Sequence, residues 1–169
     1  MKRFIFLTFA LLIVCMVGCV PKEEAEVEHV ESSIIASGQS LPEHFEELAT
    51  ERNHEKLMAV RAKNEQDYEE VWKAFQITEE LSRIDMEEKD VLFMGLFESS
   101  SCPYTISNVV AHPEKQQLEV SITSKDGDCT ADHSPRNFVL ALDQQTSAEL
   151  STLILHLNAE TISLPITDK

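Results

Sequence analysis

Apolar and polar positions alternate over much of the second half of the chain, which is the pattern of half-buried β-strands. The alternation is clearest over residues 118–123, and Phe138, Leu140 and Leu142 repeat it with a larger apolar side chain at every second position. An uninterrupted apolar run over 91–94 predicts a strand that is buried on both of its faces. Shorter segments with strand-like composition lie at 57–60 and 104–110.

One segment has the period of a helix. The large apolar residues that recur there at i, i+3, i+4 and i+7 are Tyr68, Val71, Trp72 and Phe75. Asn64 precedes them and is the predicted N-cap. We interpret this face as one that packs on a sheet, with an aromatic platform for a ligand as the alternative. A weaker helix is predicted to begin with Ser40 as its cap and Pro42 in its first turn.

The C-terminal segment fits two patterns. Residues 150–157 fit an amphipathic helix, for which Thr146 and Glu149 form a capping box. However, residues 153–157 and 162–166 each alternate strictly between apolar and polar, with a turn between them. Two alternating segments of matched length favour a β-hairpin.

These elements define the expected fold class. About seven strands and one good helix predict an α+β, mostly β fold, built as an antiparallel β-sandwich or half-barrel with one or two helices. The chain of 169 residues is long enough for one such globular domain, which we place at residues 41–169.

The charge balance restricts the partners of this domain. The chain has 14 Lys and Arg against 30 Asp and Glu, a formal net charge of −16 at pH 7. This balance disfavours nucleic acid and anionic membrane surfaces as direct partners. The sequence contains no catalytic constellation, metal-ligand spacing or phosphate-binding loop, so we predict a non-enzyme with no metal and no cofactor.

The N-terminus has the features of a secretory signal. Lys2 and Arg3 form a short positive region, and a 14-residue run without a charge follows over 4–17. This run leads into Met16-Val17-Gly18-Cys19, which resembles the lipobox of bacterial lipoproteins. The resemblance implies that residues 1–18 are a signal peptide and that the sulfur of Cys19 carries a diacylglyceryl anchor. An ordinary cleaved signal peptide and an uncleaved anchor helix are the alternatives.

Two further observations bear on this anchor. Cys15 is a poor alternative acylation site, because the bulky Val14 precedes it where the family has Gly, Ala or Ser. Lipid on Cys19 would hold the mature protein on the extracytoplasmic face of the cell membrane. Without residues 1–18 the chain keeps 12 basic and 30 acidic side chains, so the domain itself is repelled by anionic headgroups.

Residues 19–40 are predicted to form an acidic tether. The segment contains five glutamates within nine positions and has no clear apolar face, so its charges repel one another and keep it extended. An acidic docking arm or a weak cation site is the alternative.

Two cysteines remain once the signal peptide is removed and Cys19 is acylated. Cys102 and Cys129 would lie outside the cytoplasm, where disulfides persist, and we predict a structural disulfide between them. A redox-active pair and a metal site are the alternatives left open. The metal site would use His112, His133 and Asp132.

Part of the chain resembles a known family. A helix at 67–72 contains Trp72, the phrase Ile84-Asp85-Met86 precedes a buried strand, and the loop Ser101-Cys102-Pro103-Tyr104 follows it. Residues 64–142 thereby resemble the PrcB-like, or protease complex subunit, domains of extracytoplasmic lipoproteins. Cys102 and Pro103 stand where the family loop has two glycines. The resemblance implies an extracytoplasmic protease as the partner.

The favoured function is therefore a non-catalytic protein-binding or assembly module anchored to the membrane. Loops on a rigid β scaffold are where such domains make their contacts. The predicted contact residues are Ser101, Pro103, Tyr104, Asp132 and Arg136. A local Asp132–Arg136 ion pair is the alternative for the last two. The loop is also similar to that of chagasin-like cysteine-protease inhibitors, which implies an inhibitor as the alternative function. An enzyme and a purely surface-charge role are further alternatives.

Overall fold

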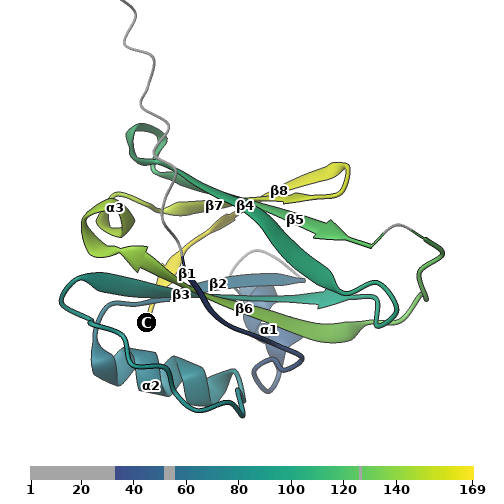
Figure 1. Ribbon diagram of the computed structural model, residues 1–169, viewed down its shortest axis with the longest axis horizontal. Coiled ribbons are helices and arrows are strands. Elements are labelled where there is room, and N and C mark those ends of the chain that lie inside the picture. The colour runs from purple at the N-terminus through teal and green to yellow at the C-terminus, as the bar shows by residue number, and fades with distance from the viewer. Residues whose placement is uncertain (1–32, 52–55, 126) are drawn as a thin grey trace, which may run out of the picture.

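Two β-sheets pack face to face, and two helices cover the outer face of one of them (Figure 1). The computed structural model describes residues 33–51, 56–125 and 127–169. The sheets are not closed into a barrel, and the predicted α+β, mostly β sandwich is confirmed. The predicted signal peptide, Cys19 and most of the predicted tether lie outside the described residues.

The first sheet has the strand order β1-β6-β3-β2-β9. Its strands, in chain order, are β1 (Ser33–Gly38), β2 (Leu57–Ala62), β3 (Lys89–Glu98), β6 (Ser134–Asp143) and β9 (Thr167–Asp168). All neighbours in this sheet are antiparallel except β2 and β9, which run parallel.

The second sheet has the order β4-β5-β7-β8. Its strands are β4 (Tyr104–His112), β5 (Gln117–Ser124), β7 (Thr152–Leu157) and β8 (Glu160–Pro165). The predicted C-terminal hairpin is confirmed as the antiparallel pair β7–β8. The expectation of antiparallel pairing throughout is wrong for β5 and β7, because the chain crosses to the first sheet and back between them and so returns in the same direction.

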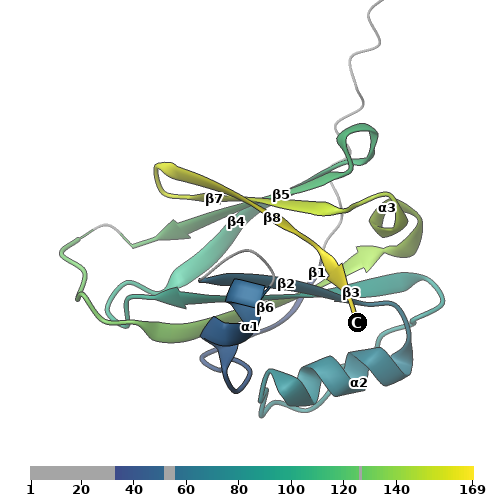
Figure 2. The same ribbon diagram turned by 180° about the vertical axis from the view of Figure 1, so that it is seen from behind.

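Three α-helices and one 3₁₀ turn connect these strands within the described residues. They are α1 (Phe45–Glu51), α2 (Glu65–Ala74), η1 (Pro113–Lys115) and α3 (Gln144–Ala148). Figure 2 shows α1 and α2 on the side of the first sheet that faces away from the second. Asp143 caps α3 by accepting hydrogen bonds from the backbone of Gln145 and Thr146, so the capping box considered for Thr146 and Glu149 is wrong.

The central strand β3 explains the uninterrupted apolar run of the sequence. Leu92, Met94 and Leu96 point into the core between the two sheets, whereas Val91 and Phe93 point into a second core under the helices. Both faces of the strand are therefore covered, as predicted for residues 91–94.

Helix α2 forms as the sequence predicts. The Asn64 side chain accepts a hydrogen bond from the Asp67 backbone N–H at 2.9 Å, which caps the helix. The stripe that begins at Tyr68 is buried, and the Trp72 and Phe75 rings lie 6.4 and 5.3 Å from the ring of Phe93. The aromatic face is core, not a ligand platform.

Helix α1 begins later than predicted. His44 has a left-handed backbone with φ of 55°, which interrupts any helix started at Ser40. Ser40 instead accepts hydrogen bonds from the Asn137 side chain on β6. Gly95 of β3 lets α1 approach closely, since a Cβ there would lie 2.8 Å from the Phe45 ring.

The globular fold begins before residue 41. Strand β1 lies within the predicted tether and pairs antiparallel with β6 from Ser33 to Gly38. Ile35 and Ala36 pack against the core under the helices, which repays the ordering of this segment. The tether prediction is therefore wrong for residues 33–38.

The C-terminal strand β9 is held by a buried guanidinium. Arg61 of β2 is 6% exposed and donates from Nε to Asp168 at 2.7 Å, and from Nη1 to the carbonyls of Ser147 and Leu150. Burial opposes ionisation of Asp168, but hydrogen bonds from Arg61 and Lys63 outweigh it and hold the pKa of this carboxyl below its usual value. One buried cation thus ties β2, α3 and the C-terminus together.

Candidate functional site

Loops from both sheets gather at one end of the sandwich. The β3–β4 loop, the β5–β6 loop and the β7–β8 turn all lie at the end where β3 finishes and β6 begins. The predicted contact residues come from the first two of these connections and their flanking strands. We call this end of the molecule the loop end.

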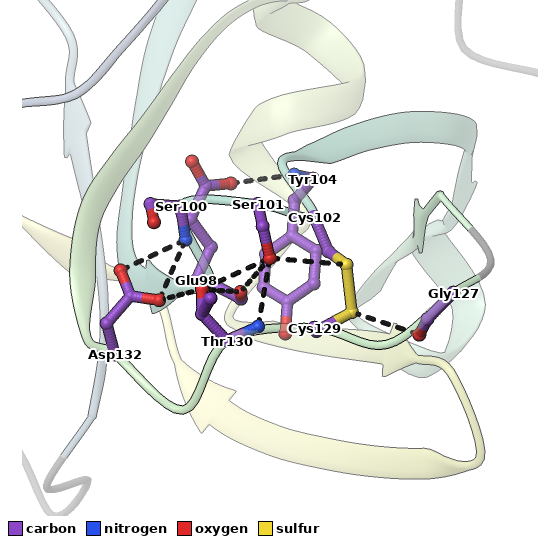
Figure 3. Close-up of a disulfide and its surroundings, with 10 residues drawn as sticks. Glu98, Ser100, Ser101, Cys102, Tyr104, Gly127, Cys129, Thr130 and Asp132 are labelled. Atoms are coloured by element: carbon purple, nitrogen blue, oxygen red, sulfur yellow. Dashed lines mark hydrogen bonds between the residues drawn. A yellow bond between two sulfur atoms is a disulfide. The ribbon is translucent and has the colours of Figure 1, made fainter.

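The predicted disulfide is confirmed at the loop end. Cys102 and Cys129 are bonded, with their Cα atoms 5.6 Å apart and a separation of 27 positions in sequence. The bond joins the β3–β4 loop to the β5–β6 loop (Figure 3). Each loop is therefore anchored by a covalent bond as well as by its strands.

A cluster of hydroxyl groups surrounds the disulfide. The hydroxyl oxygens of Ser99, Ser101 and Thr130 lie within 3.0 to 3.2 Å of one another (Figure 3). The Ser101 hydroxyl also accepts the Thr130 backbone N–H at 2.9 Å. Ser101 is therefore engaged in joining the two loops, rather than pointing freely to solvent.

Asp132 fixes the same two loops through its carboxylate. It accepts hydrogen bonds from the Thr130 and Ser134 hydroxyls and from the Ser100 backbone N–H. These donors, with Thr130 first, hold the pKa of Asp132 well below its usual value. The group therefore stays ionised across the neutral range. Its favourable contribution to stability is complete above the ordinary carboxyl pKa and is lost as the pH falls from there through the lowered pKa.

Arg136 pairs with Glu98, not with Asp132. Glu98 ends β3 with its side chain fully buried, and Oε2 accepts from Arg136 Nε at 2.8 Å. Its Oε1 lies 2.7 Å from Arg136 Nη2 as an ion pair, although no donor of the described residues is aligned with that oxygen for a hydrogen bond. The Asp132–Arg136 ion pair considered from the sequence is therefore wrong.

Tyr104 begins β4 directly after the disulfide loop. Its backbone N–H donates to Glu98 Oε2 at 2.6 Å, and its ring packs against the core between the sheets. Burial raises the pKa of the Tyr104 phenol, and the nearby carboxylates of Glu98 and Glu160 raise it further. The phenol is therefore partly shielded from water and lies in a region of negative electrostatic potential.

An open cavity of about 510 Å³ lies at the loop end between the two sheets. Its apolar lining comes from both sheets and consists of Leu57, Leu96, Phe97, Leu157 and Ile162. Its polar lining consists of Lys56, Glu98, Ser99, Tyr104, Asp132, His133 and Glu160. This volume lies within the range of about 300–1,000 Å³ that is usual for ligand sites.

Several predicted site residues converge on this cavity. Tyr104 and Asp132 line it, Arg136 supports its wall through Glu98, and Ser101 and Pro103 lie in the loop beside it. Glu98 and Glu160 were not predicted. The only sequence feature that distinguishes Glu98 is its position as a charged residue at the end of a long apolar run. No local sequence feature distinguishes Glu160 as a site residue.

The metal-site alternative for the cysteines is not supported by the arrangement. His112 ends β4 at the far end of the sandwich, where it contacts Glu114 and Glu119. His133 lies at the loop end, with its ring 5.9 Å from that of Phe97. The two histidines therefore do not share a site, and no metal-binding group of three or more His, Cys, Asp or Glu occurs in the described ranges.

Comparison with protein-family models, with curated proteins and with solved structures finds no match for this chain. Among the helices that the structure describes, none has the length and apolar character needed to cross a membrane.

We expect Glu98→Gln to lower the free energy of unfolding by about 3 kcal/mol, because it leaves the Arg136 guanidinium without its counter-charge in a site that excludes most water. Urea denaturation measures the change. The matched control is Glu87→Gln on the exposed segment before β3, which should shift stability by less than about 0.5 kcal/mol. Equal effects of the two variants would contradict the importance of the buried pair.

Loss of the disulfide through Cys102→Ser with Cys129→Ser should lower the free energy of unfolding by about 3–4 kcal/mol, since the open chain gains loop entropy when it unfolds. Urea denaturation of the oxidised protein and the double variant gives the difference. Alkylation under denaturing, non-reducing conditions should leave both cysteines unmodified, and both should react after reduction. Two reactive thiols before reduction would rule the bond out.

Proposed function

We propose that this protein is a membrane-anchored, extracytoplasmic lipoprotein that acts as a non-catalytic binding module and engages a partner protein through the loop end. The observation that carries the proposal is the open cavity between the sheets, framed by two loops that a disulfide joins. A preformed concave surface with few adjustable parts binds with little loss of conformational entropy.

The direction of the chain supports this role. Strand β1 begins with Ser33 opposite Ala141, near the end of β6, while β6 begins at the loop end. The first described residue therefore lies toward the end of the sandwich away from the cavity. A lipid on Cys19 would approach the domain from that far end and leave the cavity facing away from the membrane.

The polar groups of the cavity support binding more than catalysis. The Asp132 carboxylate is occupied by hydrogen bonds that hold the two loops, and the His133 ring packs beside Phe97. This ring contact gives His133 a packing role in the wall of the cavity, which supports binding over catalysis. The resemblance to PrcB-like domains makes an extracytoplasmic protease the first partner class to test.

The lipid anchor is tested by Cys19→Ala, with Cys15→Ala as the matched control. We expect Cys19→Ala to move the protein from the membrane fraction to the soluble fraction and to abolish incorporation of labelled palmitate, because the acyl chains supply the membrane affinity. Cys15→Ala should keep both properties. Retention and labelling of Cys19→Ala would contradict the anchor.

The binding surface is tested by photo-cross-linking in intact membranes. A photoreactive amino acid replaces Lys56 at the rim of the cavity or, as the control, Lys115 in the η1 turn at the far end. We expect a discrete adduct from position 56 and none from position 115. Filling the cavity with Ile162→Trp should remove the adduct while the variant stays folded. An adduct that forms equally from both positions, or that survives Ile162→Trp, would contradict the proposal.

A further inference from the structure

The cavity at the loop end combines an apolar floor with carboxylates. Leu96, Phe97 and Ile162 provide apolar surface from both sheets, while Asp132 and Glu160 add negative charge at the rim. Lys56 is the one cationic side chain in the lining of this cavity. The site is therefore amphipathic, with acidic groups at its polar edge.

Glu98 contributes acceptor capacity within the wall. Arg136 balances its charge, but the buried Oε1 has no aligned hydrogen-bond donor in the part of the chain that the structure describes. Glu98 therefore adds negative potential to the wall from behind its surface, and the accessible carboxylates of the lining are those of Asp132 and Glu160.

The pKa of Tyr104 indicates a negative electrostatic potential next to these carboxylates. Burial raises the pKa of its phenol first, and the negative charges of Glu98 and Glu160 raise it further. The same field that disfavours a phenolate favours a cation.

Strand β8 presents a free β-edge next to the cavity. It is the edge strand of the second sheet and supplies Glu160 and Ile162 to the lining. Its outer edge has no strand partner among the described residues. An extended peptide can pair with such an edge and direct alternate side chains to one face, where pockets select them.

We infer that the cavity binds an extended segment of a partner polypeptide in which lysine or arginine lies next to apolar residues. The apolar stem of the basic side chain, or its apolar neighbour, covers the leucine and phenylalanine floor. The cationic head lies beside Glu160 and Tyr104 at the rim. The inference rests on the proposed function, because it specifies the chemistry of the partner at the same site.

The test is selection of a random nonapeptide library, displayed on phage, against the full-length protein immobilised in detergent. We expect the selected peptides to be enriched at least about twofold in lysine and arginine beside apolar residues. The affinity of a synthetic selected peptide should fall at least about tenfold for Glu160→Lys, because charge reversal at the rim repels the cation. Glu87→Lys makes the same charge change at the far end and should alter the affinity less than about twofold.

Replacing the basic residues of that peptide with glutamine should weaken its binding by a similar factor. Three results would overturn the inference: no enrichment of basic residues, equal binding of the glutamine peptide, or unchanged affinity in Glu160→Lys. In each of these cases, the adduct from position 56 in membranes shows whether the binding module itself still holds. Loss of both peptide selection and adduct would remove the proposed function as well.

Discussion

The loop end depends on one buried ion pair, between Glu98 at the end of β3 and Arg136 near the start of β6. The carboxylate of this pair also accepts the backbone N–H of Tyr104, at the start of β4. The pair therefore joins two strands of the first sheet and fixes the point where the chain crosses to the second. A charge buried in this way is costly unless both partners are present, so the crossing has one favourable geometry. The ion pair fixes the ends of the two loops, and the disulfide and the hydroxyl cluster hold the loops to each other.

Features that follow from local pattern could be predicted from the sequence. The alternation in β5, the double-sided burial of β3 and the Asn64 cap of α2 all depend on residues within one element, and the structure has each of them. The half-buried strand expected from 138–142 is wrong, because β6 is buried on both faces there. Features that depend on distant partners were missed. Strand β1 follows a run of glutamates and becomes a strand because β6 offers it an edge, and β9 has two residues that gain order from Arg61.

The candidate site likewise has some features that local sequence predicts and others that depend on distant residues. The disulfide could be predicted because two cysteines remain after the others are assigned, and Tyr104 and Asp132 because they flank those cysteines. The partner of Arg136 could not be predicted, since Glu98 lies 38 positions away and Asp132 is closer in sequence. Glu160 and Ile162 belong to the cavity only because β7 runs beside β5, a parallel pairing that no local pattern indicates. A cavity between two sheets is a property of their packing, and it has no sequence signature.

The attachment of β9 to β2 also affects the order in which the protein can fold. Strand β2 lies early in the chain, but its outer edge and the Arg61 guanidinium acquire their partners from residues 147–168, which follow Arg61 by 86 to 107 positions. Until those residues are available, a growing chain holds an unpaired strand edge and a cation with no counter-charge in an otherwise apolar layer. Contacts of such sequence separation form late and slow the reaction. The domain is therefore expected to reach its native state only after synthesis of β9, and nascent chains that stop short of it depend on chaperones to cover that edge.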